Sequence, residues 1–489
     1  MIPACGNSPS GAGTSGGTSR DGGSIDGGSM DGGQPEGGAV CEPGASIWPA
    51  CADGKACAFY VAPTGGDDSG SGTSSGPFAT LERLQAALAA APSSSKVGCL
   101  RAGSGGTYDR TATLTLTSAD DGETWQFDPA GGVDTAVLDG GSSVDLIAVN
   151  GASNVTINGL ALQHFNAYGI NGSGSGDTIE NCDVGFNVVT SWHSAGIVFG
   201  GTSLNTAFRH NYVHDLGSQG IALFDGYSTP GDINGSAIEG NVVLRAVQRM
   251  YDGGGIYVSM HGGCFVNQAC AVTVTNNFVR DQGSSAISGP YGDSVNGIYL
   301  DDNASNVTVT GNIVGPLTPG ILDGSNDNNC TGFEIHNGSH NTITGNIVDL
   351  GSSGKVETAN WGLDSASIAG MMGNTFTNNI AISGFTGAQQ TSSSGITGYS
   401  YFNPSPASWT TIDDNMYFDY AGGQVRTDGN NASDAKPVIE DPQISGWTYR
   451  IAAGSPALAS PVSFPPIAGG WGPPGFAIPE SGAPPSSPH

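Results

Sequence analysis

Two near-copies of one eight-residue segment constrain the fold of this chain more than any other feature. They read Val-Thr-Val-Thr-Asn-Asn-Phe-Val at residues 272–279 and Val-Thr-Val-Thr-Gly-Asn-Ile-Val at residues 307–314. After a polar insert, each copy is followed by a second short apolar segment, at 296–301 and at 331–336. Self-similarity at a period of about 20–50 residues is typical of solenoids, in which each repeat forms one unit of a stack.

The repeat can be followed along the chain through the asparagine that closes the first segment. Eight such asparagines recur at steps of 30–36 residues: Asn181, Asn211, Asn241, Asn277, Asn312, Asn346, Asn379 and Asn415. Because an asparagine side chain both donates and accepts hydrogen bonds, residues at the same turn of successive coils can bond to those above and below. The spacing therefore predicts an asparagine ladder.

The second segment also repeats, as a glycine followed by alternating apolar residues. It begins at Gly196, Gly220, Gly255, Gly297 and Gly332. Short alternating runs predict strands with one buried face. Coils this short, with Gly and Asn at the corners and no helical stretch between strands, exclude βαβ units. We therefore predict an all-β parallel β-helix of about ten coils, stacked at about the 4.8 Å strand spacing.

Composition excludes several classes of partner. The 489 residues include 14 Lys and Arg against 43 Asp and Glu, for a formal net charge of −29. This charge argues against binding to nucleic acid or to an anionic membrane surface. It also argues against an acidic polysaccharide, unless Ca²⁺ bridges the charges. No run of about 18 apolar residues exists, so no transmembrane span is expected.

The nine cysteines are unevenly placed. Cys264 and Cys270 flank one loop, and we expect them to form a disulfide in an oxidising compartment. Cys182 is expected to pack inside a coil as a small apolar residue. A zinc site is not expected, because the chain contains no Cys-x₂-Cys pair. Four more cysteines surround the start of the folded part, with connectivity left open: Cys41, Cys51, Cys57 and Cys99.

The N-terminal residues suggest that the protein is anchored through a lipid. The first five residues, Met-Ile-Pro-Ala-Cys, resemble the end of a bacterial lipoprotein signal, in which Cys5 would be lipidated. A charged and apolar leader is then expected upstream of Met1; the alternative is an ordinary free cysteine. Residues 1–40 are rich in Gly, Ser and Asp, and we predict that they form a disordered tether. The protein is accordingly expected to be secreted or lipid-anchored to the bacterial outer surface.

Both ends of the predicted solenoid resemble a known group. Phe-Tyr-Val-Ala-Pro-Thr-Gly-Gly-Asp-Asp at 59–68, with Gly-Pro-Phe-Ala-Thr-Leu at 76–81, resembles the opening of secreted bacterial β-helix proteins of the pectate-lyase-like superfamily. Residues 441–458 resemble their closing segment. The resemblance implies a right-handed parallel β-helix over residues 41–460, with an N-terminal cap at 57–92.

Within the predicted cap, Pro77 is expected at a helix start, with Leu81, Leu84 and Leu88 on one face. At the other end of the chain, the Pro- and Gly-rich tail at residues 461–489 is expected to be loosely ordered.

Period-2 alternation locates the outer face of the second strand of each coil. If Ile298 and Leu300 face the core, Tyr299 and Asp301 face outward. The same register places Tyr257 and Ser259 outward on the preceding coil, and Glu334 and His336 on the following one. Acidic, aromatic and imidazole groups would thus gather on three coils about 5 Å apart. We interpret this as a carbohydrate-binding and catalytic groove; a merely solvated polar face is the alternative.

Two segments on neighbouring coils resemble paired segments of β-helix glycoside hydrolases, closest to the α-L-fucosidase/xylanase family. They read Met-Tyr-Asp-Gly-Gly-Gly-Ile-Tyr at 250–257 and Asn-Gly-Ile-Tyr-Leu-Asp-Asp at 296–302. The resemblance implies that Asp252 and Asp301 are the catalytic pair. In straight strands, seven residues of about 3.3 Å would separate them by roughly 20 Å, too far for a glycosidase. The pair therefore requires a fold-back at Gly253–Gly255 or an offset between coils, and Glu334 is the replacement.

Further residues are predicted to line the groove. Those expected to bind substrate are Tyr257, Tyr299, Asp302, His336 and His261. His193 and His214, on earlier coils, are weaker candidates and are more typical of ordinary surface positions. No cofactor or resident metal is expected, although Asp323 and Asp327 in a polar insert could hold Ca²⁺.

These features predict an extracellular glycoside hydrolase, most simply a monomer, that acts on an oligosaccharide or polysaccharide. Two alternatives stay open. A polysaccharide lyase of this superfamily would typically use Lys or Arg as base, and only Arg245, Arg249 and Arg280 lie near the predicted groove in the sequence. A non-catalytic carbohydrate-binding adhesin is the other alternative, because a fold does not fix a function.

Overall fold

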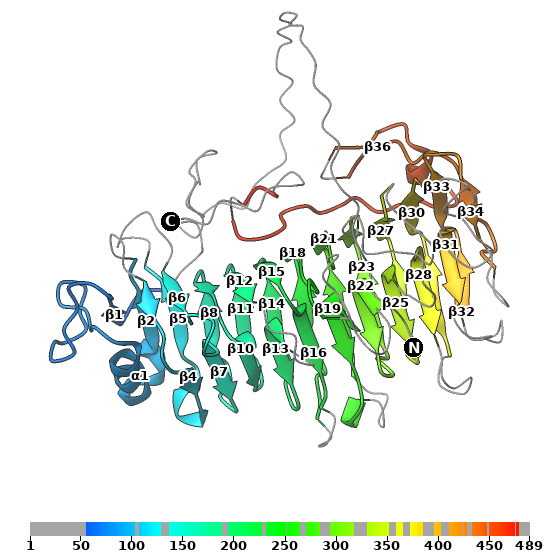
Figure 1. Cartoon of the computed structure of the whole chain (residues 1–489). Coiled ribbons are helices and arrows are strands. Elements are labelled where there is room, and N and C mark those ends of the chain that lie inside the picture. The colour runs from blue at the N-terminus through cyan, green and yellow to red at the C-terminus, as the bar shows by residue number, and fades with distance from the viewer. Residues whose placement is uncertain are drawn as a thin grey trace, which may run out of the picture.

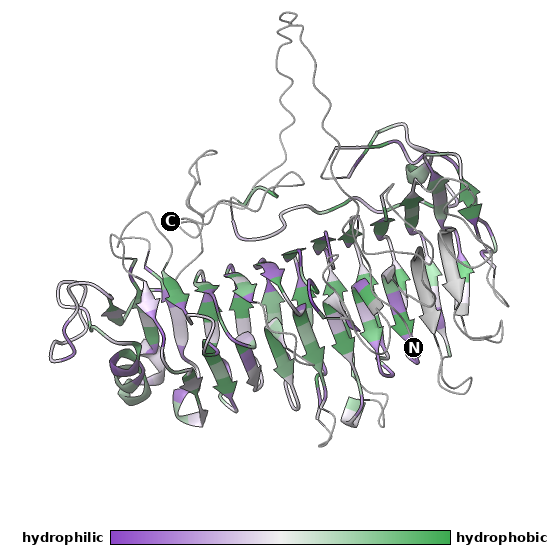
Figure 2. Cartoon of the chain, viewed as in Figure 1, coloured by the Kyte–Doolittle hydropathy of each residue, from purple (hydrophilic) through white to green (hydrophobic). Residues whose placement is uncertain are grey.

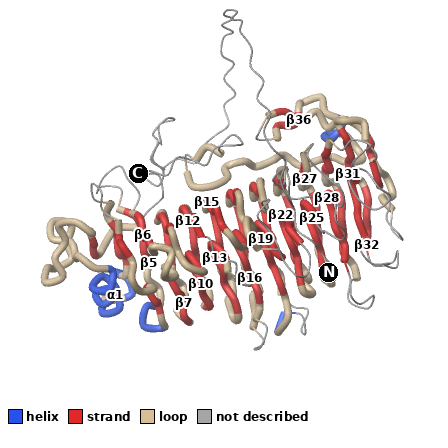
Figure 3. Tube along the Cα trace, in the orientation of Figure 1, coloured by secondary structure: helices blue, strands red, loops and turns tan. Residues whose placement is uncertain are grey.

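The chain forms one elongated stack of coils (Figure 1). The computed structural model describes residues 55–478 except 103–106, 129–135, 188–193, 227–230, 251, 265–269, 284–293, 317–329, 352–357, 365–371, 385–395, 402–409, 424, 428–432, 447–448 and 475. Three long parallel sheets of twelve, eleven and twelve strands run along the stack (Figure 3). Among these described residues, no helix is long and apolar enough to cross a membrane.

The first sheet contains β1 (Phe59–Val61), β2 (Val97–Leu100), β5 (Thr124–Phe127), β8 (Thr156–Asn158), β11 (Thr178–Glu180), β14 (Ala207–Arg209), β17 (Ala237–Glu239), β20 (Val272–Thr275), β23 (Val307–Thr310), β26 (Thr342–Thr344), β29 (Asn374–Thr377) and β32 (Thr410–Asp413). The second contains β4 (Leu114–Leu116), β7 (Ile147–Asn150), β10 (Tyr168–Ser173), β13 (Ala195–Gly200), β16 (Gln219–Phe224), β19 (Asp252–Ser259), β22 (Ser294–Asp301), β25 (Cys330–His336), β28 (Thr358–Asp364), β31 (Ile396–Tyr401) and β34 (Val425–Arg426).

The third sheet contains β3 (Tyr108–Asp109), β6 (Val137–Asp139), β9 (Ala161–Gln163), β12 (Asp183–Asn187), β15 (Tyr212–Leu216), β18 (Val242–Leu244), β21 (Phe278–Arg280), β24 (Ile313–Val314), β27 (Ile347–Asp349), β30 (Ile380–Ser383), β33 (Met416–Asp419) and β35 (Val438–Ile439). A small antiparallel hairpin of β36 (Ile444–Ser445) and β37 (Arg450–Ile451) follows. The stack is somewhat longer than the ten coils predicted, because its first coils carry no repeated asparagine.

Alternation of side chains explains why these segments form strands. In β20, Val272 and Val274 are buried while Thr273 and Thr275 are partly exposed. The repeated segment of the next coil, β23, lies directly against it, with Val272 opposite Val307 and Val274 opposite Val309. Hydrophobic residues alternate with more polar ones along the strands of the stack (Figure 2). One continuous apolar core therefore runs along the interior of the stack.

The asparagine ladder is present, with one correction. From Asn211 to Asn415, each backbone N–H and side-chain amide donates to the Oδ1 of the next asparagine at 2.9–3.0 Å, as seen for Asn277 and Asn312. Asp434 receives the last bonds. Asn181 is not in the ladder; it occupies the left-handed corner one residue earlier, and Cys182 takes the ladder position. Sequence spacing alone could not reveal this one-residue shift.

Replacing Asn277 by Ala is expected to destabilise the fold. The change leaves the buried Asn241 N–H and amide without an acceptor and the Ile238 carbonyl oxygen without its donor. Buried polar groups that lose a partner cost about 1–3 kcal/mol each, so a total of several kcal/mol is expected. Chemical denaturation would measure the loss. Thr273→Ala, on the outer face of the preceding strand, is the control and should change stability little; equal stability of both variants would contradict the ladder's role.

The N-terminal cap differs slightly from the prediction. Helix α1 (Leu81–Ala90) begins at Leu81, not near Pro77, because the Thr80 hydroxyl accepts a hydrogen bond from the Arg83 N–H and caps the helix. Leu81, Leu84 and Leu88 are buried as predicted. A disulfide joins Cys57 to Cys99, whereas Cys41 and Cys51 lie outside the described residues. Cys182 is buried with a free thiol.

The C-terminal strap, residues 449–474 and 476–478, overlaps the segment after Ser460 that was expected to be loosely ordered. It runs back over the third sheet (Figure 1). The apolar outward row under it comprises Tyr212, Val242, Leu244, Phe278, Ile313, Ile347, Ile380, Ile382 and Met416. The strap covers this row with Val462, Phe464, Trp471 and Phe476, among others. Its order therefore comes from the surface it covers, and composition alone could not show that surface.

Candidate functional site

Two outward rows on β19, β22 and β25 form the site. One row is Tyr257, Tyr299 and Glu334, which pair in register across the three strands. The other contains Ser259 paired with Asp301, followed by His336. As period-2 alternation predicts, Ile298 and Leu300 belong to the core cluster, whereas Tyr257 and Tyr299 belong to a separate cluster on the other face of the sheet.

Asp301 is the centre of the cluster. Its Oδ2 accepts a hydrogen bond from the Tyr257 hydroxyl at 2.8 Å. Its Oδ1 lies 2.6 Å from Nδ1 of His336 and accepts the N–H of Asp302 at 2.7 Å. The residue is 5% exposed. These contacts from three directions fix the carboxyl group in place at the surface of the sheet.

A loop after β19 adds a second acid–imidazole pair beside the first. Nε2 of His261 lies 2.5 Å from Oδ2 of Asp302. The fully buried Asp225 positions this loop, because its carboxylate accepts the N–H groups of His261, Gly262 and Cys264. Asp225 was not predicted from the sequence. In the sequence it is only an acidic residue after strand β16, and its role can be recognised only when the next coil is stacked beside it.

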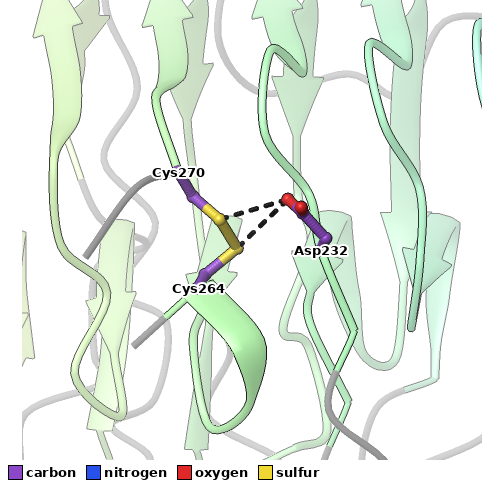
Figure 4. Close-up of side chains that lie close together, drawn as sticks. All are labelled: Asp232, Cys264 and Cys270. Atoms are coloured by element: carbon purple, nitrogen blue, oxygen red, sulfur yellow. Dashed lines mark hydrogen bonds between the residues drawn. A yellow bond between two sulfur atoms is a disulfide. The ribbon is translucent and has the colours of Figure 1, made fainter. Parts of the chain in front are cut away.

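The same loop is closed by a disulfide between Cys264 and Cys270, with an S–S distance of 1.99 Å (Figure 4). Asp232 Oδ1 lies 3.2 Å from Sγ of Cys270 and 3.8 Å from Sγ of Cys264. Because disulfide sulfurs carry no proton, we regard these as close contacts. The paired sulfurs also cannot act as thiolate metal ligands.

Asp252 lies at the start of β19, opposite Ser294, while Asp301 lies opposite Ser259 at the other end. The strand between them contains three consecutive glycines, Gly253 to Gly255. A Cβ on Gly254 would lie 2.6 Å from the carbonyl oxygen of Ile256 and 3.1 Å from Cβ of Tyr299, so only glycine fits. The register of β19 with β22 runs without a shift from Asp252 to Ser259, so the strand pairing itself does not show the fold-back that the Asp252–Asp301 pair was predicted to require.

Burial and the neighbouring Asp301 and Asp302 carboxylates raise the pKa of Asp252 to about 7, while His336 acts weakly in the opposite direction. Its Oδ1 is buried without a hydrogen-bond partner. Asp252 is therefore within electrostatic range of the cluster, and its carboxyl group retains a proton well above the usual range for Asp.

Tyr299 and Glu334 belong to the other outward row. Tyr299 is 5% exposed, and its ring meets that of Tyr257 edge to face with centroids 5.5 Å apart. Burial, followed by the charges of Asp301, Glu334 and Asp252, raises the pKa of Tyr299 well above its usual value. Glu334 is also buried.

One group of atoms in this site has metal-ligating character. A carboxylate oxygen from each of Asp301 and Asp302 and a ring nitrogen of His336 lie within 4.8 Å of one another. A nitrogen ligand is unlike the all-oxygen set that Ca²⁺ prefers. A cation would also have to displace donors that Asp301 already engages. Hydrogen bonding alone accounts for the arrangement.

Other predicted positions fall elsewhere. His193, Asp323, Asp327 and Cys5 lie outside the described residues. His214 does not line the groove: it lies on β15 of the third sheet, buried between Asp183 and Asp215 at 2.7 and 2.6 Å. Burial opposes the charged ring, but these two carboxylates outweigh it and raise the pKa of His214.

The three arginines weighed as lyase bases are not in the groove strands. Arg245 binds Asp215 beside the third sheet, and Arg280 ends β21 of that sheet. Arg249 lies on the exposed part of the connection between β18 and β19. No Arg residue therefore lies in the described strands that carry the site.

A family model described as a right-handed β-helix region matches residues 145–348, from just before β7 to within β27. The fold is a right-handed parallel β-helix. No curated protein sequence matches the chain significantly.

Solved structures similar to this right-handed β-helix include a pectate lyase, at 15% identity and TM-score 0.49, over 85% of this chain and 94% of that one. They also include a XylC protein in complex with xylose, at 10% identity and TM-score 0.47, over 79% and 87%. A third is the A-module of an Azotobacter vinelandii mannuronan C-5 epimerase, at 16% identity and TM-score 0.44, over 74% and 95%. Similarities this low carry no conclusion about substrate or reaction.

Proposed function

We propose that this right-handed β-helix is a glycoside hydrolase that acts on a neutral carbohydrate at the outer face of its second sheet. One observation carries the proposal: two carboxyl groups on neighbouring strands have contrasting surroundings. Asp252 is partly buried and has a pKa raised to about 7, whereas Asp301 engages Tyr257, His336 and a backbone N–H. Pairs of carboxyl groups in such different environments suit the two roles of glycosidic hydrolysis.

In the proposed mechanism, Asp252 is the general acid and gives its proton to the leaving glycosidic oxygen. Asp301 supplies the carboxylate that either accepts a proton from the attacking water or attacks the anomeric carbon itself. Tyr257 and His336 position Asp301, and Tyr299 lies beneath the sugar. Glu334 is the replacement for Asp252 if the acid role lies elsewhere, because it adjoins Tyr299 on the next strand.

The charges of the site favour a neutral substrate. Strands β16, β19, β22 and β25 contain no Lys or Arg. A uronate would instead meet Asp252, Asp301, Asp302 and Glu334, and like charges at short range repel. This supports hydrolysis over the lyase alternative, and it fits the resemblance of the two Gly-Ile-Tyr segments to the α-L-fucosidase/xylanase family. Cys5 and the tether predicted at residues 1–40 support a proposal that the enzyme works outside the cell.

A screen with product analysis tests the proposal. The purified protein would be incubated with aryl fucosides, xylan, and pectic fragments, and products would be identified by mass spectrometry and NMR. New reducing ends with one added water per cleavage are the expected result. Carbohydrate binding without turnover of any substrate would instead support the adhesin alternative.

A lyase is the second candidate, because one contact favours it. The 2.6 Å contact between Asp301 and Nδ1 of His336 orients the imidazole as Asp–His pairs do in general-base catalysis. A lyase would give unsaturated products that absorb in the ultraviolet and contain no added water. Such products would overturn the hydrolase proposal.

Activity is expected to fall as the pH rises through about 7. The pKa of Asp252 is raised to about 7, so the acid is protonated below that pH and loses its proton above it. The dependence of kcat/KM on pH between 4 and 9 measures this limb. Asp252→Asn should abolish the limb together with most activity on substrates with poor leaving groups, and retain more on aryl glycosides. An unchanged basic limb in Asp252→Asn would contradict the assignment.

A further inference from the structure

We infer that the chain binds a linear neutral oligosaccharide in a groove on the outer face of its second sheet, on the N-terminal side of the catalytic site, with Tyr168 and Phe224 as its platforms. This inference rests on the proposed function, because it assigns the substrate class of the same site.

Strand register aligns the site with a cavity farther along the same sheet face. The row of Tyr257 continues through Ala222 and Val198 to Asn171, each paired with the next. The row of Asp301 continues through Ser259 and Phe224 to Gly200. Both rows lie on the outer face of the second sheet. The cavity and the site therefore lie on one sheet face, separated by the buried residues Ala222 and Ser259.

That surface is hollowed where these rows continue. A cavity of about 570 Å³ lies over β4, β7, β10, β13 and β16. Its lining includes Tyr168, Val198 and Phe224, together with the polar residues Asn150, Asn171 and Ser173. Four strand steps separate β4 from β16, which at about 4.8 Å per step is on the order of 20 Å. This length suits several sugar residues and exceeds the size of a single one.

The floor of the groove is one apolar cluster that ends at the catalytic tyrosines. Ala195, Val198, Ala222, Tyr257 and Tyr299 are buried and packed together, with Tyr168 and Phe224 partly buried against them. Asp145 holds Tyr168 in place, because its Oδ1 accepts the N–H groups of Ala167 and Tyr168. Gly200 leaves room for the Phe224 ring, since a Cβ there would lie 2.6 Å from a ring carbon. Glycine at that position keeps the aromatic ring at the surface of the groove.

The chemistry of the lining selects a neutral chain. The described lining residues include two aromatic rings, several amide and hydroxyl groups, and no Lys or Arg. Aromatic faces pack against the apolar C–H faces of sugar rings, and amides and hydroxyls bind their hydroxyl groups. The single charge in the lining is Asp145, whose negative sign disfavours a polyuronate.

Binding as a function of chain length tests the inference. Titration calorimetry on the Asp301→Asn variant, which should not consume ligand, would use neutral fragments of xylan, mannan and glucan of one to six residues. In at least one series, affinity is expected to rise up to about four or five residues and then level off. Oligogalacturonates of the same length should bind more weakly.

Substitutions of Tyr168 and Phe224 test whether their rings bind the sugar. Tyr168→Ala and Phe224→Ala, each combined with Asp301→Asn, should weaken pentasaccharide binding by about tenfold, the order of one lost aromatic contact. Monosaccharide binding should not change. Tyr168→Phe, which keeps the ring, and Tyr420→Ala, at a 48% exposed tyrosine after β33 of the third sheet, are the matched controls. Melting temperatures establish that each variant is folded.

The outcomes separate this inference from the proposed function. If binding depends on chain length but the wild type hydrolyses no substrate, the groove is supported and the hydrolase proposal is refuted. If the wild type hydrolyses a substrate but Tyr168→Ala and Phe224→Ala do not change pentasaccharide binding, the hydrolase is supported and the groove is refuted. The groove is refuted if no neutral series binds, if affinity does not depend on length, or if oligogalacturonates bind more tightly.

Discussion

Asp301→Asn is expected to lower turnover by about 10²–10⁴-fold on the substrate that the screen identifies, the usual effect of losing one acid–base group. The amide can replace the carboxylate sterically. Its oxygen can accept from His336 and from the Asp302 N–H, and its NH₂ can donate to the Tyr257 oxygen. The fold should therefore persist while the charge is lost. Steady-state kinetics and the melting temperature measure the two effects separately.

Asp139→Asn is the matched control. Asp139 also faces a histidine, His164, at 2.8 Å, but it lies on β6 of the third sheet, away from the site. Its turnover should stay within about twofold of wild type. Glu334→Gln addresses the replacement assignment. Full activity in Asp301→Asn with an unchanged melting temperature would refute the site, and a larger loss in Glu334→Gln would transfer the acid–base role to that residue.

Deleting the C-terminal strap from Ser460 onward is expected to cause the largest loss of stability. The deletion removes the buried Val462 and Phe464 and the partly buried Trp471 and Phe476, and exposes the apolar row on the third sheet. Burial of one large apolar side chain contributes about 1.5–3 kcal/mol, so the loss should be several kcal/mol. The melting temperature should fall markedly, and the truncated protein should bind a hydrophobic dye.

A shorter truncation provides the control for this prediction. Ending the chain at Ile478 keeps the strap, including the contact of the Gly472 N–H with the Gly240 carbonyl oxygen and that of the Asn276 amide with the Gly469 carbonyl oxygen. This variant should melt like the full chain. If removal of residues 460–489 changes neither melting temperature nor dye binding, the strap does not contribute to stability.

Much of the fold and of the site could be predicted because both depend on a short period along the chain. The Val-Thr-Val-Thr copies predicted stacked coils, and β20 and β23 lie in register residue by residue. Alternation in Gly-Ile-Tyr-Leu-Asp placed Tyr299 and Asp301 outward and Ile298 and Leu300 inward. In a strand, the direction of a side chain follows from its position parity, and in a stack of parallel coils equivalent residues become neighbours.

The sequence by itself thus determined the repeat, the strand faces and the row of acids and tyrosines on three coils. Only the tertiary structure decided what depends on contacts between distant segments or on a one-residue shift. Cys182 replaced Asn181 in the ladder, His214 fell on the third sheet, and Asp252 came within electrostatic range of the Asp301 carboxylate. The strap became ordered because it covers an apolar surface that many coils build together. Periodicity is encoded locally, whereas corner offsets, bends and burial arise from the whole stack, so no single segment of the chain contains them.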